Sequence, residues 1–485
     1  MRRHFLPLLP YFFLCLLFSS AHAAGLVDYV NPLQGTDSKR EFSHGNTYPA
    51  IALPWGMNVW TPQTGVNRDG WIYKYRENTI RGFRQTHQCS PWTNDYAAFS
   101  LMPVSGKLIA AQDQRATPFQ HANEQAGPHY YKVVLDNKIS AEMAPTERGA
   151  FLRFEYPEDQ GAFLVVDANS GGSEVKIFPR ERKIIGICKN APRSVPENFA
   201  NYFVIQFDQP FTAHGTWQNN DGQTFPGETE RRGDYVGAYV QFRPGAKVNV
   251  KVASSFISPG QAEENLRREL GRHRSVASVK NAAERAWNEH LGRVRIDGGT
   301  PEQLATFYSC FYRSMLFPRQ FHEYDTRGKP VYYSPYDGKI HSGYLYTDTG
   351  FWDTFRAQFP LNVILFPAMH GRYMASLLDA YDQSGWLPSW SFPGHSGGMI
   401  GNHAFSVLAD AHAKGIRTFD PEKVLAAMWH DANAKGPRGP SIGRSGAEHY
   451  WKLGYVPSDK HGEATAKTLE YAYDDWCAWQ LARSI

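Results

Sequence analysis

The hydrophobic period of the chain changes near Ser258. Before this residue, short β-branched and aromatic runs separated by turn residues predict strands at 131–135, 151–156, 163–166, 202–207, 236–242 and 247–253. In the last run Val248, Val250 and Val252 alternate with polar residues, as in a strand with one buried face. Many short strands without helical segments between them predict an antiparallel β-sandwich over residues 24–257.

The part of the chain after Ser258 has helical spacing. Ala262, Leu266 and Leu270 recur every four residues and a similar stripe follows at 279–291, so we predict a helical linker over residues 258–298. Residues 299–485 then show helical patterns at 304–311, 352–358, 373–381, 403–414, 421–434 and 469–479. The long loops between them favour an α-helical toroid over a bundle, whose connections are usually about 2 to 8 residues.

The first 23 residues have the pattern of a secretory signal peptide. Two arginines precede an apolar run at 5–18, and a small-residue cleavage motif ends at Ala23. The apolar run is shorter than the roughly 20 residues that a membrane span needs. We therefore predict a periplasmic or secreted protein, cleaved after Ala23, with no membrane anchor. The formal net charge is +4 without a basic patch, which argues against nucleic acid as a partner.

Four cysteines lie outside the signal peptide: Cys89, Cys188, Cys310 and Cys477. They are far apart and form no CxxC pair, which argues against a cysteine zinc site or a small disulfide scaffold. One disulfide stays open, because spacing alone cannot decide it.

Aromatic residues make up 14% of the chain, and many lie beside Asp, Asn, His or Gly. A sugar ring has apolar C–H faces edged by hydroxyls, so a sugar site combines flat aromatic rings with polar groups. Packing in a large β-protein explains the same composition. Carbohydrate binding is therefore one of two interpretations at this point.

The segment YTDTGFWDTFR is the first candidate for a site. If a helix begins near Gly350, Trp352 and Asp353 lie on its first turn, and Asp353 and Arg356 are neighbours three residues apart. An ordinary helix start also places Asp near the positive end of the helix dipole, with Arg paired to it. Both interpretations fit the segment.

The glycine-rich loop in GHSGGMIGNHAF is the second candidate. It leads into a helix that begins near Asn402 and His403, where backbone amides can meet an anion or another ligand. The loop lacks the spacing of nucleotide-binding loops. A tight turn needs the same glycines, so a purely structural role is the alternative.

The third candidate is the terminal helix. Glu470 and Asp474 lie four residues apart, and paired carboxylates are the equipment of a glycosidase. Residues at this spacing are only about 5 to 6 Å apart at Cβ, and such acids are more often solvated. The helix also carries an apolar stripe that includes Leu469, Trp476 and Trp479, and no cap follows it before Ile485.

Several long motifs in the same order resemble glycoside hydrolase family 92, the calcium-dependent exo-α-mannosidases. They are VDYVNPLQGTDSKREFSHGNTYPAIALPWGMNVWTPQTG, RGFRQTHQCSPWTNDYAAFSLMP, YTDTGFWDTFRAQFPL, SGGMIGNHAFSVLADAHAKGI and GYVPSDKHGEATAKTLEYAYDDWC. The resemblance implies an amino-terminal β-sandwich, a galactose-mutarotase-like supersandwich, packed on an (α/α)6 toroid. It also implies removal of terminal α-mannose, commonly α-1,2-linked, from glycans such as N-glycans, with inversion and bound calcium.

The resemblance places site residues only in part of the family pattern. Trp352 and Asp353 match the motif that contacts the terminal mannose, and Arg356 follows them. His44 and Asn46 match a sandwich loop that reaches the site. Trp71 matches a family aromatic, and Asn402 and His403 belong to a third matching motif.

The family's acid and base motifs do not occur in this sequence, whose last residue is Ile485. The resemblance implies that they would follow Ile485. We therefore assign no catalytic residue and no metal ligand, and expect residues 299–485 to form an incomplete toroid that lacks most calcium ligands. Such a toroid would leave the Trp476 and Trp479 side exposed. The alternatives are a carbohydrate-binding protein without catalysis and a different toroid hydrolase or lyase that acts on another polysaccharide.

Overall fold

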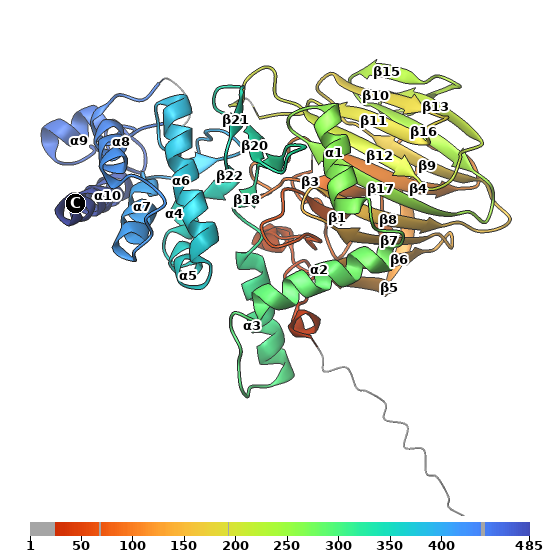
Figure 1. Ribbon diagram of the computed structural model, residues 1–485, viewed down its shortest axis with the longest axis horizontal. Helices are drawn as coiled ribbons and strands as arrows, with labels where there is room; N and C mark the ends of the chain where they lie inside the picture. Colours follow the sequence, from red (N-terminus) through yellow and green to blue (C-terminus); the bar gives the residue numbers. More distant parts are fainter. Residues whose placement is uncertain (1–24, 67–68, 193, 438–441) are drawn as a thin grey trace, which may run out of the picture.

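The computed structural model describes residues 25–66, 69–192, 194–437 and 442–485. A β-rich half is followed by a mainly helical half, as predicted (Figure 1). The predicted signal peptide, 1–23, lies outside the described residues. In the described ranges no helix is both long and apolar enough to cross a membrane.

Two large antiparallel sheets form the sandwich in the part of the chain that the structure describes. The seven-stranded sheet has the order β1 (Val59–Gln63), β3 (Gly82–Thr86), β4 (Phe99–Ser105), β9 (Ala162–Asp167), β16 (Val236–Phe242), β13 (Ala213–Gln218) and β14 (Gln223–Pro226). The ten-stranded sheet has the order β15 (Glu230–Gly233), β10 (Ser173–Phe178), β11 (Lys183–Cys188), β12 (Asn201–Phe207), β17 (Lys247–Ser255), β8 (Gly149–Glu155), β7 (Ser140–Pro145), β6 (Tyr130–Leu135), β5 (Thr117–Gly127) and β2 (Thr79–Ile80). Every predicted strand corresponds to an observed one.

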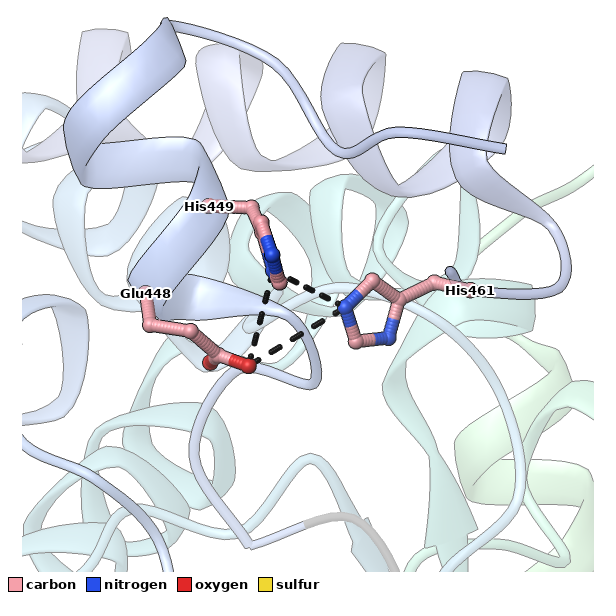
Figure 2. Close-up of side chains that lie close together, drawn as sticks. All are labelled: Glu448, His449 and His461. Atoms are coloured by element: carbon pink, nitrogen blue, oxygen red, sulfur yellow. Dashed lines mark hydrogen bonds and ion pairs between the residues drawn. The ribbon is translucent and has the colours of Figure 1, made fainter. Parts of the chain in front are cut away.

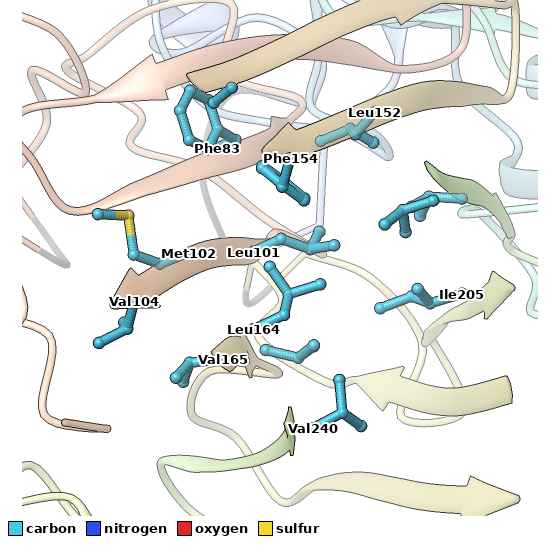
Figure 3. Close-up of a cluster of buried hydrophobic side chains, with 14 of the residues drawn as sticks. Phe83, Leu101, Met102, Val104, Leu152, Phe154, Leu164, Val165, Ile205 and Val240 are labelled. Carbon is cyan, nitrogen blue, oxygen red and sulfur yellow. The ribbon is translucent and has the colours of Figure 1, made fainter. Parts of the chain in front are cut away.

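The core of the sandwich lies between these sheets. Leu101 and Leu164 of one sheet face Phe154 and Ile205 of the other, all buried (Figure 3). Along β17 the three alternating valines are buried, and the residues between them are partly accessible, as the sequence predicts. Alternation of period two therefore identified the inner face correctly.

Two helices cover the outer face of the ten-stranded sheet (Figure 1): α1 (Pro259–Leu270) and α2 (Val276–Leu291). Ala262 of α1 packs on Val204 and Ala253 of the sheet, and Val279 of α2 packs on Phe151. These helices occupy the segment predicted as a linker. α2 also contacts the next helix, α3 (Pro301–Ser314), and so connects the sandwich to the helices that follow.

Ser258 begins α1, because its hydroxyl oxygen accepts a hydrogen bond from the backbone amide of Gln261 at 3.1 Å. We expect Ser258→Ala to lower the free energy of unfolding by about 1 kcal/mol, since one helix amide loses its partner. Ser258→Asp keeps an acceptor at the same place and should be close to wild type. Urea unfolding followed by circular dichroism measures both, and an equal loss in both variants would contradict the capping role.

Short strands fill a stretch between α3 and the next helix for which we predicted no regular structure. They are β18 (Arg319–Gln320), β19 (Glu323–Tyr324), β20 (Pro330–Tyr333), β21 (Ile340–Ser342), β22 (Tyr346–Thr347) and β23 (Thr349–Gly350), with β24 (Trp390–Ser391) pairing to the last. Strands of two to four residues are too short to show a period of two, so the sequence does not reveal them.

The later helices are α4 (Phe351–Thr354), α5 (Gln358–Leu365), α6 (Pro367–Ser384), α7 (Ala404–Ala413), α8 (Pro421–Asn433), α9 (Ala447–Leu453) and α10 (Ala464–Ser484). The single helix predicted at 352–358 is wrong: Ala357 has ψ −43 but φ −138, and the chain bends there between α4 and α5. The prediction also missed α9. The remaining patterns fall on α3, α6, α7, α8 and α10, which confirms the helical character of this half.

The terminal helix buries a different face from the predicted apolar stripe. Tyr471, Asp474, Cys477 and Leu481 are buried, whereas Leu469 is exposed. The predicted buried face of this helix is wrong because the observed one includes Asp474, which a hydrophobic pattern counts as polar. Trp476 and Trp479 are 52% and 49% exposed, as expected.

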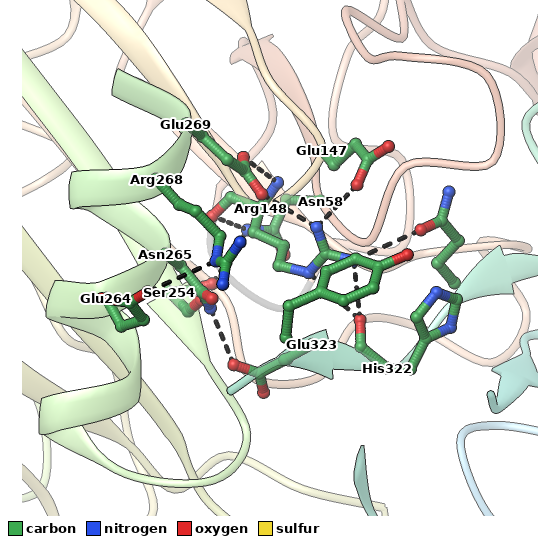
Figure 4. Close-up of polar contacts among 12 residues, drawn as sticks. Asn58, Glu147, Arg148, Ser254, Glu264, Asn265, Arg268, Glu269, His322 and Glu323 are labelled. Atoms are coloured by element: carbon green, nitrogen blue, oxygen red, sulfur yellow. Dashed lines mark hydrogen bonds and ion pairs between the residues drawn. The ribbon is translucent and has the colours of Figure 1, made fainter. Parts of the chain in front are cut away.

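A buried arginine connects the sandwich to both neighbouring regions (Figure 4). Arg148, just before β8, pairs with Glu269 of α1 at 2.9 Å and donates to the carbonyl oxygen of His322 at 2.9 Å. Asn265 of α1 also donates to Glu323 of β19 at 2.7 Å. Because these groups come from three segments and are largely buried, they fix α1 and the short strands against the sandwich.

Asp431 of α8 is a buried carboxylate that accepts a hydrogen bond from the amide of Leu387 at 2.9 Å. Burial raises its pKa to about 7, above the unfolded value, so it costs stability as pH rises from about 4 to 7. We expect the wild type to lose about 2–3 kcal/mol more than Asp431→Asn between pH 5 and 7.5. Urea unfolding at both pH values measures this, and parallel losses would contradict it.

Candidate active site

A cavity of about 580 Å³ lies where sandwich loops meet the start of the helical half. It is lined by residues of four segments: Asn46; Cys89, Ser90, Trp92 and Thr93; Asp348, Thr349, Gly350, Asp353, Thr354 and Gln358; and Trp390, Ser396, Gly397, Gly398 and Met399, with Arg313 and Phe317 beside them. Two predicted site residues, Asn46 and Asp353, are part of its surface. The size and the mixture of polar and aromatic groups suit a small-molecule or single-sugar ligand.

The loop that brings Asn46 to the cavity has an unusual backbone. Ser43, His44, Gly45 and Asn46 all have positive φ, at 51, 46, 77 and 54°. Residues other than glycine enter this region at a cost of roughly 1 kcal/mol each. A Cβ at Gly45 would overlap the carbonyl oxygen of Gly35, so only glycine fits there. A loop held in this way is typical of a binding site.

Aromatic rings hold this loop and continue to the cavity. The indole nitrogen of Trp71 donates to the carbonyl oxygen of Ser43 at 2.7 Å, and the Trp71 ring contacts His44 edge to face at 5.4 Å between centroids. Trp71 also contacts Trp92, 5.5 Å away, and Trp92 lines the cavity. His44 and Trp71 therefore do not line the cavity themselves, but Trp71 contacts Trp92, which does.

One lining residue of the cavity, Asp348, belongs to a buried ion pair. The carboxylate of Asp348 binds the guanidinium of Arg319 and accepts a hydrogen bond from the hydroxyl of Tyr96 at 2.8 Å. Burial raises the pKa of Asp348 to about 6, and Arg319 acts in the opposite direction. Within the described residues Oδ1 of Asp348 has no hydrogen-bond partner, and Asp348 lines the cavity.

The predicted trio on α4 divides into two roles. Asp353 lines the cavity with an exposed carboxylate, and partial burial raises its pKa, opposed by Arg356. Trp352 instead donates its indole N–H to Glu470 of α10 at 3.1 Å. Arg356 lies over the Trp352 ring at 4.7 Å and also pairs with Glu470, at 3.4 Å. The predicted partner of Arg356, Asp353, is therefore not the carboxylate that it binds.

Glu470 and Asp474 are not solvated acids. Asp474 is fully buried, and Nδ1 of His403 lies 2.9 Å from its Oδ1. Nε2 of the same ring lies 3.2 Å from Glu470. These distances are those of ion pairs, although the angles are poor for hydrogen bonds. Burial raises the pKa of Asp474, and His403 opposes this shift. The two acids therefore bind α10 to α7 and α4.

The end of the sequence lies apart from the cavity surface. Ile485 directly follows α10 and is 50% exposed. It does not belong to the residues that line the cavity. The expectation that the family's acid and base would follow Ile485 stays a prediction. None of the described cavity residues is assigned either role.

The glycine-rich loop holds an internal carboxylate at its helix start. The backbone amide of Asn402 donates to Oδ2 of Asp474 at 2.6 Å, and the side-chain oxygen of Asn402 accepts from Arg444 at 3.1 Å. Asn402 and His403 are 3% and 1% exposed, and neither lines the cavity. Gly398 and Met399 of the same loop reach the cavity itself.

The four cysteines are free thiols. Cys89 lines the cavity, Cys188 lies in the sandwich core, Cys477 is buried in α10 and Cys310 is exposed on α3. Among the described residues these four cysteines therefore form no disulfide.

Two family models match nearly the whole described chain. Residues 29–255 match the glycosyl hydrolase family 92 N-terminal domain, and residues 261–485 match the glycosyl hydrolase family 92 catalytic domain. The chain belongs to glycosyl hydrolase family 92. The antiparallel sandwich and the helical half described above correspond to these two matched domains.

Solved family 92 structures have the same fold. The inverting mannosidase BT2199 of Bacteroides thetaiotaomicron VPI-5482 is 49% identical, with a TM-score of 0.93 over 96% of this chain and 63% of its own. The α-mannosidase BT3965 of Bacteroides thetaiotaomicron, solved with mannoimidazole, is 30% identical with a TM-score of 0.83 over 95% of this chain and 61% of its own. A secreted glycosidase of Arthroderma benhamiae is 24% identical over 96% of this chain and 61% of its own. The chain thus spans less than two thirds of each relative.

The cavity residues do not by themselves suit calcium. Ca²⁺ takes about 6 to 8 oxygen ligands, including several carboxylates or carbonyls. Among the described residues the cavity offers two carboxylates, Asp348 and Asp353, and one oxygen of Asp348 is already bound to Arg319. We therefore derive no chemical step that depends on this ion.

Proposed function

We propose that this family 92 chain belongs to an α-mannosidase that removes terminal α-mannose from glycans with inversion. The observation that carries the proposal is the cavity between the sandwich loops and α4. It lies in a chain whose sequence is 49% identical to that of an inverting mannosidase with the same fold. Mannoimidazole bound to BT3965 supports a mannose-shaped ligand. The finer parts of the proposal are α-1,2 linkages, N-glycan substrates and a requirement for calcium.

The cavity has groups suited to one sugar ring. The Asp353 carboxylate and the Asn46 amide can hydrogen-bond to hydroxyls, and the rings of Trp92 and Trp390 can face apolar C–H groups. Inverting hydrolysis needs an acid and a base about 6.5–9.5 Å apart, with a water between base and sugar. We assign the described cavity residues to holding the sugar and assign neither catalytic group among them.

The proposal includes a secreted or periplasmic location. The first 23 residues have the pattern of a signal peptide, and the Arthroderma benhamiae relative is a secreted glycosidase.

Two measurements on the purified chain test the proposal. Calorimetry with mannoimidazole measures binding, and incubation with an aryl α-mannoside and α-1,2-mannobiose, with calcium or with EDTA, measures mannose release. Calcium-dependent release with an inverted anomer by NMR supports the whole proposal. Binding without release supports the sugar contacts and excludes hydrolysis by this chain alone, release that EDTA does not affect removes calcium from the proposal, and neither binding nor release overturns the mannose assignment.

A further inference from the structure

Two histidines and a glutamate converge at the far end of the helical half from the sandwich. Glu448 and His449 lie on the first turn of α9, and His461 lies in the segment that leads into α10 (Figures 1 and 2). Nδ1 of His449 and Nε2 of His461 are 3.1 Å apart. Oε1 of Glu448 is 3.5 Å from the first nitrogen and 4.0 Å from the second. These are three potential ligand atoms around one point.

The structure assigns this cluster as a binding site for one Zn²⁺ ion. Zinc takes imidazole nitrogen and carboxylate oxygen at about 2.0–2.2 Å, which in a tetrahedron places neighbouring ligand atoms roughly 3.3 Å apart. The two distances at His449 are close to this value. The longer one, to His461, can shorten by rotation of Glu448, whose side chain is more than half exposed. Water would take the fourth position.

The two facing nitrogens share a hydrogen bond in the structure, and the same two lone pairs can instead bind one cation. A neutral imidazole has one nitrogen that donates and one that accepts, so two nitrogens at 3.1 Å must share a proton unless an ion binds both lone pairs. The Glu448 carboxylate adds negative charge at the same point. Two imidazoles and one carboxylate suit zinc and its transition-metal neighbours, whereas calcium prefers oxygen ligands alone.

The backbone around the cluster positions His461. A Cβ at Gly446 would lie 3.1 Å from Cδ2 and 3.2 Å from Nε2 of the ring, so glycine makes room for the imidazole. Val456 and Ala464, on either side of His461 in the chain, are buried together with Tyr471 of α10. Packed neighbours on both sides therefore fix the position of the His461 ring.

A bound ion would connect α9 to the segment 454–463 that precedes α10. This helix carries Glu470 and Asp474, which hold Trp352 and the amide of Asn402. Zinc should thus stabilise the helical half, because a ligand that binds only the folded state raises its stability. This role is independent of the proposed mannosidase activity.

The test uses the full chain without a histidine tag, dialysed against a chelator and titrated with ZnCl₂ by calorimetry. We expect one equivalent of zinc to bind. His461→Gln should weaken binding by about 100-fold and Glu448→Gln by about tenfold or more, since even outer-shell changes cost about 10–100-fold. His341→Gln is the matched control, because His341 also pairs with one carboxylate, Asp337, outside the cluster.

Thermal unfolding gives a second readout. Zinc at about 100 times the wild-type Kd should raise the Tm of the wild type by a few degrees and that of His461→Gln by less than about one degree. Excess Ca²⁺ should not displace zinc, which separates this site from any calcium site. Binding that is not stoichiometric, or that is equal in wild type and His461→Gln, would overturn the proposal.

Discussion

Arg319→Met should lower the free energy of unfolding by about 3–5 kcal/mol, which is the cost of leaving one member of a buried ion pair without its partner. Arg319 and Asp348 are both fully buried. The guanidinium also donates to the carbonyl oxygen of Met57 and, at 2.6 Å, to the hydroxyl of Tyr96. Methionine fills a similar volume but supplies none of these donors. Urea unfolding followed by tryptophan fluorescence measures the change.

Two further variants make this result specific. Arg327→Met removes an arginine of the neighbouring loop that is 77% exposed and pairs with Asp325, so it should cost less than about 1 kcal/mol. Adding Asp348→Asn to Arg319→Met should recover part of the loss, because no charge is then left buried. A loss in Arg319→Met no larger than that in Arg327→Met would contradict the structural role of the pair.

The cost of Arg319→Met should also depend on pH. Burial already raises the pKa of Asp348 to about 6 with Arg319 present, and removing the guanidinium raises it further. The folded-state pKa is then above the unfolded one, so stability falls as pH rises through the folded value and recovers in acid. We expect the difference from wild type to be smaller at pH 5 than at pH 8.

The second large effect concerns ligand binding. Asp353→Ala should weaken binding of mannoimidazole by about 30–150-fold, or roughly 2–3 kcal/mol, because charge-assisted hydrogen bonds to hydroxyls are lost from a cavity. Asp353 is exposed in the cavity, so the variant should unfold at nearly the wild-type urea concentration. Calorimetry measures the affinity, and the prediction rests on the proposed mannose ligand.

Asp410→Ala is the matched control for this experiment. Asp410 lies on α7 and pairs with Lys414 at 2.7 Å on the surface, away from the cavity lining. Its removal should change the affinity by less than about twofold. Equal losses in Asp353→Ala and Asp410→Ala would mean that the ligand does not bind at the cavity, and unchanged affinity in both would remove Asp353 from the sugar contacts.

The sandwich was predictable because its strands are long enough to show a pattern. β17 has nine residues, of which the first six alternate in burial, and β16 has seven residues, most of them buried. Strand order and pairing were not predictable, because β4 lies beside β9, which is about sixty residues further along the chain. The short strands β18 to β23 were invisible for the opposite reason: two to four residues carry no period, and their positions depend on tertiary pairing.

The candidate site was only partly predictable. Asn46 and Asp353 were found because motifs mark them, and both line the cavity. Arg319 and Tyr96 are separated by more than two hundred residues, and neither lies in a charge pattern that indicates their contact with Asp348. His403 shows the converse limit: its place at a helix start suggested a ligand contact, but it lies between two acids of α10, Glu470 and the buried Asp474. The substrate roles of the predicted residues stay predictions.

The loop Ser43–Asn46 has a consequence for affinity. Flexible loops lose conformational entropy when a ligand orders them, and this loss subtracts from the binding free energy. Here four left-handed residues, the Gly35 backbone against Gly45 and the Trp71 hydrogen bond fix the loop during folding. The Asn46 side of the cavity is therefore ordered before a ligand binds. The conformational entropy of that loop is lost during folding and does not reduce the binding free energy.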